Sequence, residues 1–480
     1  MYKKLCVLVG FGMVSMLTSA QNLYMNDLKL KADLDWLHNQ GVVQISTSTW
    51  PLTANEIKRA LNTAQVTTQA QQQIVQSVQH LLEQNPDSLV KAGAALYLQT
   101  NRQQLPQTFA DNQLAGQQAT VQIGLSEADW EVNLQATVKN DKLINDSSDV
   151  SFEGSYLAGM TANQWLIAGK IPTWWGPGHD GSLIKGDASL PVTGITMQRD
   201  QQTAPTSKYL SWVGPWQYQL FAGQLEDYEA VPDTKLFGAR LTANPWDWLE
   251  VGASRTFMWG GDGRPESFSS FTDALLGTRD NGGTGKEDPA NQLGGFDAKV
   301  SLSSLVNVPA SVYAQYIGED EAGGLPAKNM YLAGVDYASA AYGKPYQLYA
   351  EYTDTRSSGE VYRGGSYNHS IYTDGYYQQG YPLGYALGGN AESVALGGRL
   401  WLDNRNFINA KVQHAKVNQA DRNNQTNQAF PMTDKLTAVD VAWEHQLQPL
   451  TMIKTRVWAV NSDVQSNEIG AGVGLEFKTY

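Results

Sequence analysis

The residues best suited to chemistry stand in one short run, residues 172–183, which reads PTWWGPGHDGSL. Trp174 and Trp175 come directly before a Gly-Pro-Gly turn, and His179 and Asp180 follow it. Indole rings offer flat apolar faces, and imidazole and carboxylate groups exchange hydrogen bonds with hydroxyls. We expect such a surface to bind a sugar, stacking its C–H faces and bonding its hydroxyls. The competing interpretation places both tryptophans in an interfacial aromatic belt, with the glycines and proline only turning the chain.

A second aromatic concentration occupies residues 356–390, where tyrosines alternate with glycine and asparagine. Its tyrosines include Tyr362, Tyr367, Tyr372, Tyr376, Tyr377 and Tyr381. One interpretation is a second carbohydrate-contacting surface, with Tyr372, Tyr376 and Tyr377 as the candidate contacts. The other is a lid that folds inward and packs on itself. The sequence favours neither.

Metal and catalytic chemistry find little support. The six histidines show no pair at metal-ligand spacing. The carboxylates on the glycine-rich segment 259–293 match no calcium-ligand pattern, so a solvated surface is favoured there. They include Asp262, Asp273, Asp280, Glu287 and Asp288. With no G-x-S-x-G elbow and no phosphate-cradling glycine motif, we expect no metal, no cofactor and no catalytic residues.

The first twenty residues predict export. Lys3 and Lys4 precede an apolar run over residues 5–17, and small residues at 18–20 suit cleavage before Gln21. This is a secretory signal peptide, too short to span a bilayer as a helix. Cys6, the single cysteine, lies inside it. Removing the two lysines from 34 basic residues leaves 32 against 47 acidic ones, a balance of −15, which disfavours nucleic acid as a partner.

Residues 21–87 predict a small bundle of helices. Leucines and Trp36 repeat at helical spacing from residue 28 until Gly41. Thr53 and Glu56 form a capping box, in which each side chain is expected to bond a backbone N–H of the other. A third helix is expected over residues 67–84. We expect this bundle to plug the domain that follows, residues 88–480.

From residue 89 the apolar period changes from 3.6 to 2, as in the segment from Trp130 to Val138. Outward apolar and inward polar residues alternate in this way along transmembrane β-barrel strands. About eighteen strands are expected, at 89–100, 117–125, 129–139, 150–160, 163–171, 193–200, 216–225, 235–243, 247–258, 294–303, 309–318, 328–339, 344–355, 391–402, 405–416, 436–446, 450–460 and 469–479.

The connections distinguish a barrel from a β-sandwich, whose strands alternate too. Long links at 172–192, 259–293, 356–390 and 417–435 alternate with tight turns such as Asp403-Asn404; the link 201–215 is the one exception. Long loops on one rim and tight turns on the other are typical of outer-membrane barrels. We therefore predict an all-β transmembrane barrel of about 18 antiparallel strands. Its loops should be extracellular, and its helical bundle and termini periplasmic.

At this point the chain resembles the Wzi family of capsule-assembly outer-membrane proteins. The motifs that carry the resemblance are WWGPG at 174–178, WVGPW at 212–216, GQLED at 223–227, GFD at 295–297, GYPLG at 380–384 and GGNAES at 388–393. The resemblance implies an 18-stranded barrel plugged by a periplasmic helical bundle. It also implies a surface lectin, not an enzyme, that anchors or organises capsular or extracellular polysaccharide.

Three functions remain to be compared. The first is the glycan-binding barrel, with outer-membrane lipid and the barrel-assembly machinery as further partners. The second is a porin-like diffusion channel, because eighteen strands enclose a wide lumen. The third is an outer-membrane lipid or sugar hydrolase, for which the sequence offers the least support.

Overall fold

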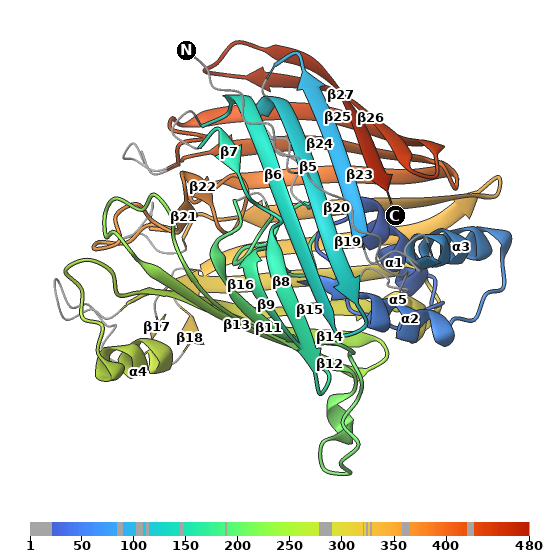
Figure 1. Ribbon diagram of the computed structural model, residues 1–480, viewed down its shortest axis with the longest axis horizontal. Helices are drawn as coiled ribbons and strands as arrows, with labels where there is room; N and C mark the ends of the chain where they lie inside the picture. The colour runs from blue at the N-terminus through green and yellow to red at the C-terminus, as the bar shows by residue number, and fades with distance from the viewer. Residues whose placement is uncertain are drawn as a thin grey trace, which may run out of the picture.

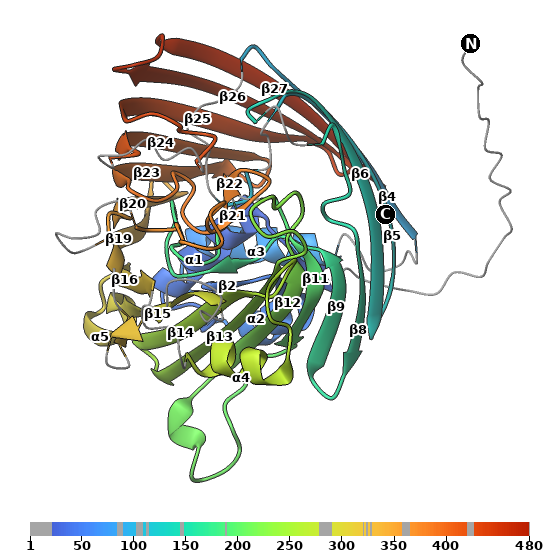
Figure 2. The ribbon, with the colours of Figure 1, turned by 90° about the vertical axis from the view of Figure 1, so that its left-hand side faces the viewer.

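The structure, a computed structural model, describes residues 22–83, 90–101, 109–111, 115–144, 148–187, 190–277, 290–319, 321–322, 325–326, 329–357, 365–419 and 427–479. Its main feature is a closed antiparallel barrel, in which the last strand pairs with the first wall strand (Figures 1 and 2). The signal peptide expected over residues 1–20 lies outside the described residues. Among the helices of the described segments, none is long and apolar enough to cross a bilayer.

The barrel wall is built from consecutive strands, each hydrogen-bonded to its sequence neighbours. Its strands are β4 (Val90–Gln99), β5 (Ala115–Glu127), β6 (Trp130–Lys142), β7 (Val150–Ser151), β8 (Tyr156–Thr161), β9 (Gln164–Lys170), β11 (Thr193–Arg199), β12 (Trp216–Gln224), β13 (Lys235–Trp246), β14 (Leu249–Trp259), β15 (Ala290–Ser301), β16 (Ala310–Glu319), β19 (Asn329–Ala341), β20 (Lys344–Asp354), β23 (Glu392–Asp403), β24 (Asn406–Val417), β25 (Asp434–Gln448), β26 (Thr451–Ser462) and β27 (Glu468–Thr479). Because β7 and β8 both pair with β6 and share one place, these nineteen segments of the described chain fill eighteen positions. The predicted barrel and strand number are confirmed.

One strand differs from its expected course. The strand predicted over residues 150–160 is broken at 152–155, between β7 and β8. Gly154 has a φ of 85°, a left-handed conformation that glycine adopts without a steric penalty. The Ser155 hydroxyl takes over the pairing: it accepts from the Gln135 N–H at 2.8 Å and donates to the Gln135 carbonyl at 2.9 Å. The wall therefore has a local break beside β6.

Side chains alternate along the wall as a lipid-facing barrel requires. On β12, Leu220 is 46% exposed, whereas Gln217 and Gln219 face inward and are buried. Buried polar side chains on the inner face mean that the lumen is filled with protein. Two sets of segments fill it, one from each end of the barrel.

We call the end that carries tight turns, such as those at 128–129 and 404–405, the short-turn rim, and the opposite end the long-loop rim. At the short-turn rim, α1 (Leu28–Asn39), α2 (Ala54–Asn62) and α3 (Gln69–Glu83) lie together (Figure 1). The Trp36 indole N–H donates to the carbonyls of Ser339 and Tyr346, both at 3.1 Å, and so holds α1 to the turn between β19 and β20.

The capping box predicted at α2 forms only in part. The Thr53 hydroxyl accepts from the Glu56 N–H at 3.1 Å, as expected of an N-cap. The Glu56 carboxylate is directed elsewhere: it accepts from the Arg59 guanidinium and from the Gln202 N–H at 2.8 Å. Because Gln202 follows β11, this carboxylate connects the helices to the wall.

The long-loop rim sends its own segments into the lumen. Two of these segments contain short strands: β10 (Trp174–Trp175), and β21 (Tyr377–Gln378) with β22 (Tyr381–Pro382). β10 pairs with β2 (Thr49–Trp50) of the N-terminal segment, in which β1 (Leu23–Tyr24) also pairs with β3 (Leu52–Thr53). Between β16 and β19, β17 (Glu321–Ala322) pairs with β18 (Leu325–Pro326). The remaining helices are α4 (Phe268–Leu276), α5 (Leu302–Val306) and the 3-10 turn η1 (Ser211–Val213). Since β2 precedes α2 and β10 comes from a long loop, material from both rims meets inside the barrel.

Candidate functional site

The tryptophans of the 172–183 run lie inside the barrel. Trp174 is 1% exposed and Trp175 fully buried. Trp174 pairs with Trp50 of β2, and Phe109 lies edge-on to both rings. The structure therefore places neither ring on an exposed surface nor in an interfacial aromatic belt. The two rings join the inward loop to the N-terminal segment.

Trp175 shows how closely the loop is fitted. Its indole N–H donates to Gln219 Oε1 on β12, and its ring fills the space above Gly238 of β13, where a Cβ would lie 2.7 Å from the ring. Its backbone N–H donates to the Lys185 carbonyl at 2.9 Å, and the Gly176 N–H donates to the Ser48 carbonyl at 2.9 Å. Through the adjacent residues Trp175 and Gly176, the loop thus contacts both the wall and the N-terminal segment.

His179 and Asp180 are also buried, within a charged network across the lumen. His179 Nε2 lies 2.6 Å from Asp336 on β19, and Asp180 accepts from Lys411 on β24 at 2.6 Å. Burial lowers the pKa of His179 to about 4, although the hydrogen bond to Asp336 opposes the shift. Both side chains fix the loop to the wall and are closed to a soluble ligand.

The tyrosine-rich segment takes the second of its two interpretations. Tyr372, Tyr376 and Tyr377 are at most 2% exposed and belong to one apolar cluster in the lumen. The Tyr376 hydroxyl donates to the Ile184 carbonyl at 2.8 Å, so this segment packs on the 172–192 loop. It is an inward-folded lid. Tyr362 lies outside the described residues.

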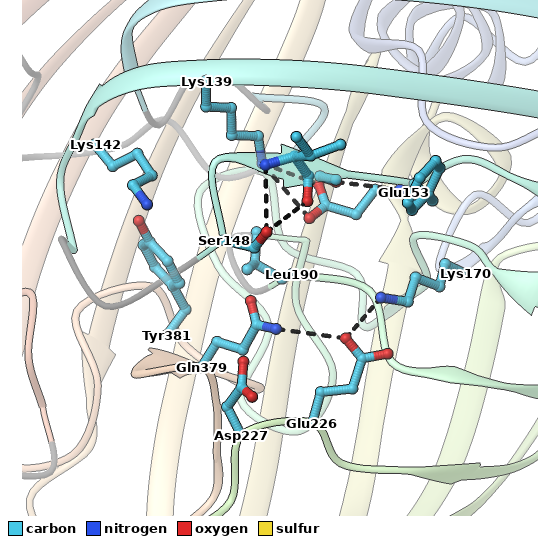
Figure 3. A pocket seen from close by; sticks show the side chains of 13 residues that line it. Lys139, Lys142, Ser148, Glu153, Lys170, Leu190, Glu226, Asp227, Gln379 and Tyr381 are labelled. Carbon is cyan, nitrogen blue, oxygen red and sulfur yellow. Dashed lines mark hydrogen bonds and ion pairs between the residues drawn. The ribbon is translucent and has the colours of Figure 1, made fainter. Parts of the chain in front are cut away.

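An accessible cavity of about 330 Å³ lies at the long-loop rim, beside the break between β7 and β8 (Figure 3). We call it the rim notch. Its lining comes from β6, the segment around β7, the end of β9, the 172–192 loop, the segment after β12 and the inward lid. The lining residues are Lys139, Lys142, Ser148, Val150, Ser151, Phe152, Glu153, Lys170, Leu190, Glu226, Asp227, Gln379 and Tyr381.

Glu226 is the centre of one side of the rim notch. Its carboxylate accepts from Lys170 at 2.6 Å and from Gln379 at 3.4 Å (Figure 3). It also accepts from the Thr193 hydroxyl at 2.6 Å. The Glu226 N–H donates to Gln378 on β21 at 3.1 Å. The buried lid therefore positions this side of the notch.

The opposite side combines ion pairs with an exposed ring. Lys139 pairs with Glu153 at 3.2 Å, and Lys142 pairs with Asp149 at 2.7 Å. Phe152 is 58% exposed at the break in the strand. A flat apolar ring beside amide, carboxylate and ammonium groups supplies the contacts that a hydroxylated ring needs: one face for C–H groups and both donors and acceptors. The rim notch suits a sugar unit of a polysaccharide.

Sequence reasoning did not identify the rim notch. Its members come from six separate segments, which only the fold brings together. The one local signal is the Glu153-Gly154 pair, which interrupts a strand pattern and predicts a bulge.

The described residues hold no group of three or more His, Cys, Asp or Glu side chains placed to bind a metal. Of the carboxylates singled out on segment 259–293, Asp262 and Asp273 are described, whereas Asp280, Glu287 and Asp288 lie outside the described residues.

Comparisons with known proteins agree with this architecture. Residues 64–466 match the family model of the capsule assembly protein Wzi. An uncharacterised 55.8 kDa protein in the cps region of Klebsiella pneumoniae is 41% identical over 477 residues, covering 98% of this chain and 92% of its own length. The solved structure of Wzi from Escherichia coli is described as an outer membrane, carbohydrate-binding β-barrel involved in group 1 capsule assembly. It is 38% identical, with a TM-score of 0.87, and the match covers 95% of this chain and 99% of that one. The chain therefore belongs to the capsule assembly protein Wzi family.

Proposed function

We propose that this protein is a lectin-like outer-membrane barrel, without enzymatic activity, that binds capsular or extracellular polysaccharide and helps to attach or organise it at the cell surface. The observation that carries the proposal is that the lumen is filled from both rims, while a polar cavity with an exposed aromatic ring remains at the long-loop rim. The carbohydrate-binding relative in Escherichia coli supports the same activity here.

In this proposal the long-loop rim faces the outside of the cell and the helices face the periplasm. Cleavage after residue 20 leaves a periplasmic bundle over residues 21–87 and a barrel over 88–480, inserted by the barrel-assembly machinery into outer-membrane lipid. Polysaccharide meets the rim notch directly from outside. Many barrels on one long polymer multiply a modest affinity for each unit.

The seven residues first considered as glycan contacts take a supporting role. Direct contact with a sugar would require Trp174, Trp175, His179 and Asp180 to leave the lumen. Tyr372, Tyr376 and Tyr377 instead position the lid that carries Gln379 and Tyr381 of the rim notch.

The channel is the second candidate, and the filled lumen argues against it. Apolar packing around Trp175 and paired charges around His179 and Asp180 cross the lumen in the described segments. A steady, large conductance from full-length protein in planar bilayers would favour the channel; a closed baseline favours the lectin.

The proposal is tested by polysaccharide retention on cells that carry variants of the rim notch. Phe152→Ala and Glu226→Gln should release polysaccharide into the medium while barrel levels stay normal. Phe268→Ala, on α4 and 84% exposed, is the matched control and should retain it. Full retention by both notch variants at normal protein levels would reject the rim notch as the glycan site.

A further inference from the structure

A second surface stands apart from the glycan site. Residues 203–215 form a projection at the short-turn rim, between β11 and β12. Figures 1 and 2 both show it extending away from the barrel wall at the bottom of the view. Because the two views differ by a quarter turn and Figure 2 looks towards the long-loop rim, the projection points outward from the wall and does not cover the lumen.

The tip of the projection is apolar and uncovered. Tyr209 is 75% exposed, Leu210 52% and Trp212 69%. The sequence of the projection, TAPTSKYLSWVGP, has one charged residue, Lys208, and no acid, in a chain with net charge −13. Large apolar side chains on a solvent-exposed loop favour contact with another apolar phase or surface.

The projection begins where the wall is aromatic. Trp216, the first residue of β12, stacks on Tyr218 with centroids 6.0 Å apart, and Trp246 at the end of β13 stacks on Trp248 at 5.4 Å. Trp246 is 56% exposed. Rings of Trp and Tyr at strand ends mark the level of the lipid headgroups on a transmembrane barrel. The projection therefore leaves the wall at that level.

The base of the projection is fixed. Arg199 donates to the Trp216 carbonyl at 2.6 Å and to the Thr203 carbonyl at 3.2 Å, and its guanidinium stacks over the Trp216 ring at 4.0 Å. The Asn244 N–H donates to the Pro215 carbonyl at 2.8 Å. With its base held on both sides and η1 formed at the tip, the projection keeps its outward direction.

We propose that residues 203–215 are a membrane-interface anchor, whose Tyr209, Leu210 and Trp212 side chains enter the phospholipid headgroup region of the leaflet at the short-turn rim. Lys208 meets the lipid phosphates, since a cation beside amphipathic aromatic residues is the composition found at such interfaces. The proposal rests on the membrane location proposed above. The partner is lipid because the projection leaves the wall at the aromatic strand ends and carries its apolar tip outside the outline of the barrel.

Spin labels placed at single cysteines test this anchor. Cys6 is the only cysteine and lies in the proposed signal peptide, so mature protein needs no cysteine removed. The probe is Leu210→Cys in nanodiscs of phosphatidylethanolamine and phosphatidylglycerol. Leu220→Cys on the wall is the lipid control, and Gln76→Cys, exposed on α3, is the aqueous control. For each label, accessibility to oxygen is compared with accessibility to a water-soluble nickel complex.

The oxygen-to-nickel ratio at position 210 should lie between those of the two controls, above that at 76 and below that at 220, as expected of a label at the headgroup level. In addition, Trp212→Phe should remove a tryptophan signal that brominated lipids quench. A label at 210 that matches the aqueous control, or that is immobilised and shielded from both reagents by protein, overturns the anchor. If position 220 also reports water, the proposed membrane location fails instead, so the two failures are distinguishable.

Discussion

Truncation of Trp175 tests whether the inward loop is held in the lumen as one unit. The indole is fully buried against Gly238 and bonded to Gln219. Removing a buried Trp side chain to Ala typically costs about 3–5 kcal/mol, through lost burial and the cavity left behind. If the loop undocks as a unit, its docking free energy falls by about that much. Since 1.4 kcal/mol is tenfold, the undocked population should rise by roughly a thousandfold.

Hydrogen exchange on purified protein measures that population. The N–H groups of Trp175, Gly176 and Gly186 donate within the lumen at 2.8–2.9 Å, so undocking exposes them. Trp175→Ala should accelerate their exchange by roughly a thousandfold and leave the wall strands protected. Trp212→Ala, which truncates an exposed ring, is the matched control and should leave the exchange of these N–H groups unchanged. Unaltered exchange in Trp175→Ala, or equal acceleration in both variants, would refute the reasoning.

Three further perturbations follow from the same lumen. Gly238→Val should lower the free energy of unfolding by about 1–3 kcal/mol, because its side chain overlaps the Trp175 ring, and by less in a Trp175→Ala background; urea titration measures both. The depressed pKa of His179, about 4 against 6.5, means that the undocked histidine binds more protons between these values. Loop docking should therefore be complete above pH 6.5 and weaken as the pH falls towards 4, by at most about 3 kcal/mol. Hydrogen exchange should show this weakening in wild type but not in His179→Gln. Asp297→Ala leaves the buried Arg240 guanidinium without its carboxylate, and should cost about 3–5 kcal/mol in the same urea titration.

Each of these expectations has its own contrary outcome. Equal costs for Gly238→Val in both backgrounds would remove the overlap as its cause. A pH dependence of exchange that persists in His179→Gln would assign the titration to another group. For the buried ion pair, Lys416→Ala is the control, since its bridge to Glu392 is 41% exposed at the lysine and should contribute less than about 1 kcal/mol. Similar losses in the two variants would contradict the distinction.

The wall was predictable because lipid imposes a simple rule on it. Outward positions such as Leu220 must be apolar and inward positions such as Gln219 are free to be polar, so period-two segments are visible in one sequence. Loop lengths then distinguish the two rims. All eighteen expected strand positions appear, and the exceptional link at 201–215 forms the projection.

The site was less predictable because burial of a loop leaves no periodic signal. Trp174, Trp175 and the tyrosines of the lid have the composition of a sugar-binding surface and equally that of a packed core. What decides between them is contact with distant residues such as Gly238 and Thr49, which a single sequence does not reveal. The rim notch depends in the same way on Lys170, Glu226 and Gln379 meeting from three segments.

Equilibrium binding of polysaccharide to purified full-length protein in nanodiscs tests the central proposal most directly. The ligand is capsular polysaccharide released from cells that make the protein, cut to short fragments so that multivalency does not mask a weaker site. Wild type and Phe268→Ala should bind with affinities within about twofold, and Phe152→Ala combined with Glu226→Gln should bind at least about tenfold more weakly, a difference of about 1.4 kcal/mol. Absence of binding by wild type, or undiminished binding by the double variant, would contradict the account.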